Sequence, residues 1–183
     1  MINNILSILS LTILFGIGLL AMSGNVEIAP SMLDVEIKVR TDSYEQQNIA
    51  DPKIALSFIN EYVGLLNNSF AGKECEMSLE QWLDNRTDVS SDFKNEYHRI
   101  LKEAALENPG YGLGFDPILD AQDFPDSGFE LYGTVSSDGY LTVKGIEWAG
   151  FKIRMRLVKE KSTWLVDGSG IINIPESEQA IRQ

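Results

Sequence analysis

The long segment from Glu107 to Gly128 divides the chain into two parts with different hydrophobic periodicities. It reads ENPGYGLGFDPILDAQDFPDSG and holds glycines on alternate positions, three prolines and four aspartates. Before this segment the apolar residues recur at helical spacing, and after it they alternate as they do in β-strands. Most connections span about 4–6 residues, so an ordered one of this length indicates a functional or a structural role. The sequence therefore predicts a helical part, a large loop and then a sheet.

The N-terminal segment, residues 1–23, is apolar and carries no charged side chain. Its apolar core covers residues 5–22, and Ala21-Met22-Ser23 provides the small residues typical of a signal-peptide cleavage site. The core is also long enough to act as an uncleaved membrane anchor. Both alternatives export the rest of the chain, and only residues 5–22 would contact the membrane. We expect the periplasm of a Gram-negative bacterium, or the periplasmic face of its inner membrane.

The chain is acidic, with a formal net charge of −12 at pH 7. Nucleic acids and anionic membrane surfaces repel such a chain, so we expect neither as a partner. Cys75 is the single cysteine, which excludes an intrachain disulfide. The fold must therefore be held by side-chain packing.

Residues 24–50 contain an additional predicted strand and a linker. In SMLDVEIKVR, residues 31–40, apolar and charged side chains alternate strictly, which indicates a strand with one buried face. We expect this strand at a sheet edge, where its charges oppose further pairing. Residues 41–50 are polar and read as a linker. The main domain is expected over residues 51–175, followed by a polar tail over residues 176–183.

Capping signals mark the start of the first two predicted helices. Asp51-Pro52 combines a preferred N-cap with a proline at the first helical position. The apolar face that follows is expected to end at Asn67-Asn68. Ser78 starts the second helix, with Gln81 three residues later as a capping box requires.

The third helix is predicted to begin near Ser90 and to end at Asn108-Pro109. It carries His98, the only histidine in the chain. No cysteine or second histidine is available to complete a metal site with it, and no hydroxyl nucleophile lies at a recognisable spacing. We interpret His98 as structural and predict neither a metal nor a cofactor.

Period-two alternation predicts four strands after the loop, over residues 129–135, 140–148, 151–157 and 163–174. Ser136 to Gly139 is a strong hairpin turn, and Gly168 and Gly170 predict a bulge in the last strand. Three helices followed by an antiparallel meander make an α+β fold. We expect the sheet to curl, with the helices on its concave side and a pocket between the two layers.

Three segments carry a family resemblance: IALSFINEYVGLLN in the first helix, FDPILDAQDF from Phe115 to Phe124, and RLVKEKSTWLVDGSG near the end. With them the chain resembles the domain-of-unknown-function family 3828, bacterial envelope proteins of the nuclear transport factor 2-like superfamily, over residues 51–175. The resemblance implies a cone-shaped fold that elsewhere hosts enzymes, carriers, dimerisation modules and immunity proteins. It implies no catalytic residues.

The loop supplies the candidate ligand contacts, which are Asp116, Gln122, Asp123 and Tyr111. Two neighbouring carboxylates can form an acid–base pair, because each perturbs the pKa of the other. The alternative is structural, with Asp116 capping a turn ahead of Pro117 and the polar side chains tying the loop to backbone amides. The sequence leaves both open.

A basic stripe supplies the candidate partner surface, which comprises Lys152, Arg154, Arg156 and Trp148. In an acidic chain such a stripe can attract an anionic partner. The alternative is a solvated outer face on which each cation pairs with a neighbouring acid. A homodimer is a further use of this face.

These observations predict an exported, non-enzymatic domain that binds a protein partner or a small ligand, for instance as an immunity protein that masks a basic toxin. The alternative is a small enzyme of the superfamily with Asp116 or Asp123 as its base. Because one fold supports many functions, the choice depends on the site.

Overall fold

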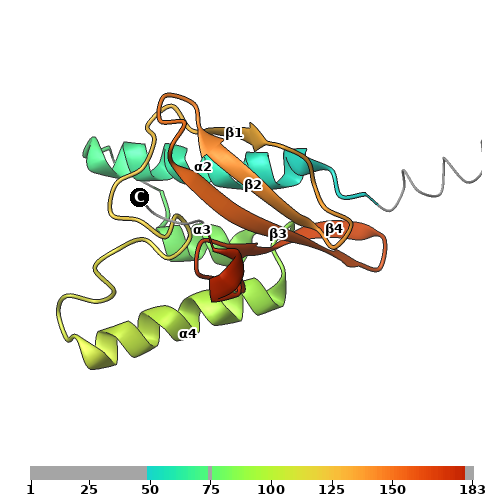
Figure 1. The fold of residues 1–183 in the computed structure, drawn as a ribbon. Helices are drawn as coiled ribbons and strands as arrows, with labels where there is room; N and C mark the ends of the chain where they lie inside the picture. The colour runs from blue at the N-terminus through green and yellow to red at the C-terminus, as the bar shows by residue number, and fades with distance from the viewer. Residues whose placement is uncertain (1–48, 74–75, 180–183) are drawn as a thin grey trace, which may run out of the picture.

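The computed structural model describes residues 49–73 and 76–179, which form an α+β fold (Figure 1). The elements in chain order are the helices α2 (Pro52–Phe70), α3 (Leu79–Asn85) and α4 (Ser91–Glu107), the strands β1 (Phe129–Tyr132), β2 (Tyr140–Gly145), β3 (Lys152–Glu160) and β4 (Thr163–Ser169), and the 3-10 helix η1 (Glu176–Glu178). The predicted N-terminal segment 1–23, the strand at 31–40 and the last four residues of the tail lie outside the described residues.

The predicted caps of α2 and α3 are confirmed. Asp51 accepts a hydrogen bond from the Lys53 backbone N–H at 2.9 Å, and Pro52 is the first helical residue. In α3 the capping box is complete, because Ser78 and Gln81 each accept the other's backbone N–H. Such caps satisfy N–H groups that have no partner within the helix.

The predicted end of α2 is wrong, because the helix continues past Asn67 and Asn68 to Phe70. Asparagine is a weak helix former, but here Asn67 donates a side-chain hydrogen bond to the Asp126 carbonyl at 3.0 Å. This contact with the loop stabilises the last turn, a tertiary effect that local propensity does not include. The predicted start and end of α4 are confirmed by the caps Ser90 and Asn108.

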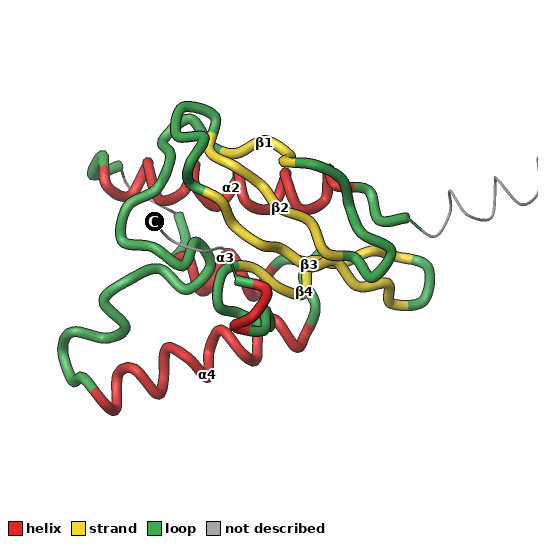
Figure 2. The backbone as a smooth tube through the Cα atoms, in the orientation of Figure 1, coloured by secondary structure: helices red, strands yellow, loops and turns green. Residues whose placement is uncertain are grey.

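The four strands form one antiparallel sheet in the order β1-β2-β3-β4, as the meander predicts (Figure 2). The predicted bulge is also present in β4. Arg156 lies opposite Gly168 whereas Leu157 lies opposite Val166, so Asp167 is the extra residue.

Three strands end earlier than the alternation predicts. β1 stops at Tyr132 because Gly133 has a φ of +84°, which takes the chain out of extended geometry. β2 stops at Gly145, where the chain enters the turn to Phe151. β4 stops before Gly170, whose φ is +61°.

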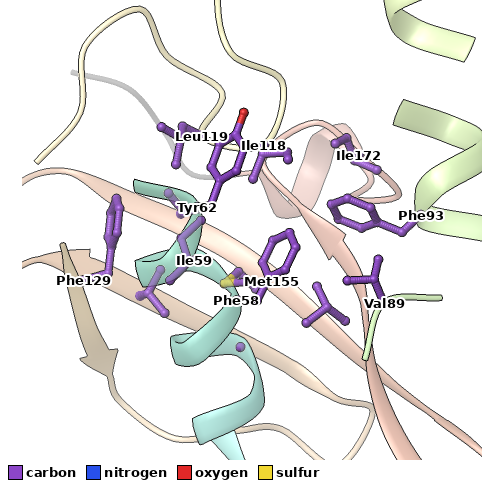
Figure 3. Close-up of a cluster of buried hydrophobic side chains, with 14 of the residues drawn as sticks. Phe58, Ile59, Tyr62, Val89, Phe93, Ile118, Leu119, Phe129, Met155 and Ile172 are labelled. Atoms are coloured by element: carbon purple, nitrogen blue, oxygen red, sulfur yellow. The ribbon is translucent and has the colours of Figure 1, made fainter. Parts of the chain in front are cut away.

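Helix α2 runs behind the sheet and α4 lies below it in the view of Figure 1, with α3 between these two helices. Buried side chains from α2, α3, α4 and the four strands fill the space between these layers. Figure 3 shows a cluster of them. Phe58 on α2 packs edge-to-face against Phe93 on α4, with ring centroids 5.6 Å apart. Ile118 and Leu119 of the long loop belong to the same cluster. Burial of each such side chain contributes about 1.5–3 kcal/mol, so the core anchors the loop as well as the helices.

None of the helices in residues 49–73 and 76–179 has the length and apolar character that crossing a membrane requires.

Candidate functional site

Asp116 fixes the shape of the loop. One of its carboxylate oxygens accepts the backbone N–H groups of Ile118 and Leu119, each at 2.9 Å, and the other accepts the hydroxyl of Tyr62 on α2. Its backbone N–H and C=O both pair with Ala121. Burial raises the pKa of the Asp116 carboxyl, although these hydrogen bonds oppose the shift. Both carboxylate oxygens are thus engaged within the protein, in the turn-capping role proposed as the structural alternative.

The anchored loop is fastened to the end of β4. Ser169 donates its hydroxyl to the Ile118 carbonyl at 2.9 Å, and Ile171 donates its N–H to the Pro117 carbonyl at 3.1 Å. Gly170 lies between them, where an added Cβ would stand only 2.4 Å from the Pro117 carbonyl oxygen. The close approach of these two backbones sets the position of the loop beside the sheet.

Beyond this contact, a pocket of about 590 Å³ opens between the loop and the start of β3. This volume falls within the roughly 300–1,000 Å³ typical of small-molecule sites. The residues that line it come from the loop, from the turn after β2 and from the ends of β3 and β4, and none comes from a helix. This position differs from the expected one between helices and sheet, which the core fills.

The pocket brings together residues that the sequence placed in two separate sites. From the loop it includes Gln122 and Asp123, and from the predicted partner surface it includes Trp148, Lys152 and Arg154. These two groups are joined only by the fold.

Aromatic groups line the same pocket. Trp148, which is 49% exposed, lies with its ring centroid 5.1 Å from that of Phe151, and Phe115 contributes a further ring. The pocket therefore combines flat apolar surfaces with carboxylate, amide and basic side chains.

Two predicted ligand contacts lie outside the set that lines this pocket. Tyr111 is 91% exposed in the first part of the loop, and Asp116 is engaged with α2 and its own turn. Gln122 lines the pocket and also donates its amide N–H to the Gly114 carbonyl at 3.0 Å, so it holds the loop as well.

Basic side chains on the outer face of the sheet pair with acids and stack on tyrosines. Lys144 pairs with Glu130 at 3.0 Å, and Arg154 pairs with Glu178 of η1 at 3.1 Å. The Lys152 ammonium lies 4.3 Å from the centre of the Tyr132 ring. These contacts match the alternative interpretation of the sequence, which is a solvated outer face where cations pair with neighbouring acids.

Arg156 is separate from the pocket. Its guanidinium lies 3.5 Å from Asp167, in a hollow that also includes Asp92 of α4. Asp167 in turn accepts the hydroxyl of Ser90 at 2.6 Å, so it joins the bulge in β4 to the start of α4. The extra residue of the bulge thus has a structural function.

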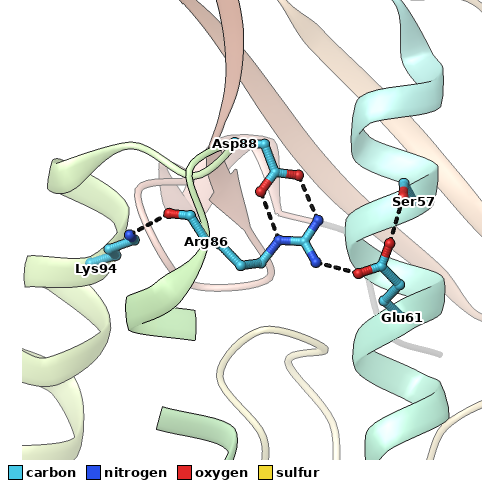
Figure 4. Close-up of polar contacts among 5 residues, drawn as sticks. All are labelled: Ser57, Glu61, Arg86, Asp88 and Lys94. Carbon is cyan, nitrogen blue, oxygen red and sulfur yellow. Dashed lines mark hydrogen bonds and ion pairs between the residues drawn. The ribbon is translucent and has the colours of Figure 1, made fainter. Parts of the chain in front are cut away.

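Sequence reasoning missed the charged cluster around Arg86 (Figure 4). Its guanidinium, 12% exposed, binds both carboxylate oxygens of Asp88 and also Glu61 on α2. It lies 4.8 Å from the centre of the Trp82 ring. Burial would raise the pKa values of Glu61 and Asp88, but the hydrogen bonds from Arg86 lower both. The cluster joins α2 to the segment between α3 and α4, and no local sequence pattern signals it.

His98 is partly exposed and lies 2.8 Å from Asp84, which fits a surface contact on α4. Within residues 49–73 and 76–179, no three histidine, cysteine or acidic side chains are grouped so that they could hold a metal ion.

No family model, curated protein or solved structure matches the chain.

Proposed function

We propose that this chain is a non-enzymatic binding domain whose ligand occupies the pocket between the Phe115–Asp123 loop and the start of β3. The observation that carries the proposal is the convergence of Gln122, Asp123, Trp148, Lys152 and Arg154 on one pocket. Polar groups placed around an apolar surface orient a ligand and select it, while the apolar surface provides binding free energy.

The chemistry of the walls favours a ligand that carries both charge signs and an apolar body. Asp123 lies on the loop side of the pocket, and Lys152 and Arg154 lie on the sheet side. Trp148 and Phe151 offer rings on which a flat or aliphatic group can pack. Amino acids and short peptides have this combination of ammonium, carboxylate and side chain.

The proposal includes the expected location and ancestry of the domain. The order of three helices and a meander is compatible with the nuclear transport factor 2-like fold that the resemblance to family 3828 implies. The apolar segment at residues 5–22 supports export to the periplasm.

Isothermal titration calorimetry of the full chain with a panel of amino acids and di- to tetrapeptides tests this function. Asp123→Asn and Trp148→Ala should each weaken binding, by about tenfold or more if a charged hydrogen bond or a ring contact is lost. Asp126→Asn is the matched control, because Asp126 is an exposed aspartate of the same loop outside the set that lines the pocket.

Binding that both pocket variants leave unchanged would contradict the pocket as the site. Failure of every member of the panel to bind would contradict the class of ligand. Native mass spectrometry of the chain from its own envelope provides an independent check, since a bound ligand adds its own mass to that of the chain.

A further inference from the structure

We propose that the ligand of this pocket is an extended peptide, which adds as a strand beside the first residues of β3. The inference rests on the proposed function and specifies its ligand. It follows from the register of β3 with its neighbours, from the direction of the Lys152 backbone N–H and C=O groups, and from the side chains on the two faces of β3.

The first part of β3 has a strand neighbour on one side only. Its register with β2 reaches Lys152, whereas its register with β4 begins at Met155. On the β4 side the Gly170 N–H bonds to the Arg154 carbonyl, and then the chain turns away to the loop. The part of the sheet edge left open in this way, residues 152 and 153, lines the pocket.

The backbone of Lys152 faces this opening. The Phe151 carbonyl accepts the Gly145 N–H, so the Phe151 polar groups point toward β2. Successive residues of a strand direct their N–H and C=O groups to opposite sides. The N–H and C=O of Lys152 are therefore directed to the pocket, where they can pair with one residue of an incoming strand.

The two faces of the sheet require different side chains on that strand. Lys152 and Arg154 stand on the outer face, where a neighbouring strand would place its residues about 5 Å away. Ile153 lies between them in sequence and is buried on the inner face with Leu119. An incoming strand that alternates acidic residues outside with apolar residues inside complements both.

The protein already pairs one of these basic residues with an acid from another segment. Glu178 of η1 reaches Arg154 at 3.1 Å, although the two residues are not in paired strands. Lys152, by contrast, lies over the Tyr132 ring and has no carboxylate within ion-pair distance among the described residues. We therefore assign the strongest acidic preference to the peptide residue beside Lys152.

Strand addition can be tested with a capped heptapeptide in which glutamate alternates with leucine. Calorimetry with the full chain should give binding that weakens about tenfold or more when the glutamates are replaced by lysines. Single N-methylation at each of three central residues then removes one N–H at a time. Strand addition predicts that methylation weakens binding about tenfold at residues whose N–H faces β3. Methylation of the residues next to them, whose N–H faces away, should have little effect.

The protein side has a matched pair of variants. Lys152→Pro removes the N–H that faces the pocket, at the first residue of a strand, where proline is tolerated. Lys152→Ala removes only the charged side chain. The proline variant should lose binding of a lysine-free neutral peptide of threonine and leucine, and the alanine variant should keep it. Circular dichroism of both variants shows whether the sheet is retained.

The outcomes separate this inference from the proposed function. Equal effects of N-methylation at adjacent peptide residues would overturn strand addition. Equal binding of the neutral peptide by the proline and alanine variants would also overturn it. If Asp123→Asn and Trp148→Ala still weaken binding in that case, the pocket remains the site and only the binding mode is wrong.

The chain itself has the acidic–apolar alternation from Leu33 to Ile37. If the heptapeptide binds only after Asp34 and Glu36 are replaced by lysine, this segment of the chain occupies the edge of β3. That result would overturn the proposal of an external peptide ligand.

Discussion

The hydroxyl of Tyr62 on α2 donates a hydrogen bond to the carboxylate of Asp116, which lies 54 positions further along the chain. Burial raises the pKa of both groups, and the carboxylate raises that of the tyrosine further. The same carboxylate caps the turn at Ile118 and Leu119. One buried contact therefore links α2 to the loop that forms a wall of the pocket.

Tyr62→Phe should destabilise the protein by about 1–3 kcal/mol, because it leaves a buried carboxylate oxygen without its donor. Urea unfolding followed by circular dichroism measures the change. Tyr97→Phe on α4 is the control, since the hydroxyl of this second buried tyrosine has no hydrogen bond to another described residue. Equal losses in the two variants would contradict a special role for the Tyr62 hydroxyl.

Asp116→Asn should change how stability depends on pH. The folded-state pKa of Asp116 lies above the ordinary value of 3.8, mainly because of burial. The neutral form therefore favours folding below about pH 3.8, and this contribution is lost as the pH rises through the folded-state pKa. The stability of the wild type relative to the asparagine variant should fall over that interval. Parallel curves of unfolding free energy against pH would contradict the raised pKa.

Arg86→Met should lower the free energy of unfolding by about 2 kcal/mol or more at neutral pH, because it leaves Glu61 and Asp88 without their largely buried partner. Chemical unfolding measures the loss. Arg99→Met is the matched control, since Arg99 pairs with Glu96 and Glu103 on the exposed side of α4, where ion pairs contribute little. A similar loss in both variants would show that burial of the cluster is unimportant.

The Arg86 cluster also predicts the effect of acid. The pKa values of Glu61 and Asp88 are lowered from 4.5 and 3.8, so their stabilising contribution is present above those values. It is lost as the pH falls through the folded-state pKa values. The difference in stability between the wild type and Arg86→Met should therefore shrink on acidification. A difference that stays constant down to pH 2–3 would contradict this explanation.

The features that the sequence predicted are those encoded within a few residues of one another. The caps at Asp51 and Ser78 depend on contacts two or three positions apart, and the bulge at Asp167 is marked by the glycine beside it. The α+β order follows from the change in periodicity on the two sides of the loop. Strand ends were predicted less well, because alternation continues in residues that have already left the sheet.

The features that the sequence did not predict depend on contacts between distant segments. Arg86 and Glu61 are 25 positions apart, and no spacing rule connects them. The pocket joins the loop around Asp123 to the strand around Lys152, so its existence depends on the path of the chain after Gly170. Residue types identified the candidate ligand contacts, but only the fold shows which of them share a surface.

Gly170→Ala should destabilise the protein and weaken ligand binding together. The residue has a φ of +61°, where a Cβ costs about 1–2 kcal/mol, and the added methyl would also stand 2.4 Å from the Pro117 carbonyl oxygen. To relieve this clash the loop must move away from the end of β4, which opens one wall of the pocket.

Gly64→Ala is the matched control for the glycine at position 170. It lies inside α2 with nothing within 4 Å of an added Cβ, so alanine should raise stability by about 0.5–1 kcal/mol and leave binding unchanged. Thermal unfolding and calorimetry of the two variants measure both effects. If Gly170→Ala keeps full affinity for the peptide panel despite its lower stability, the close approach of the loop to β4 does not set the shape of the pocket. Loss of affinity in Gly170→Ala alone would show that this backbone contact positions the binding site.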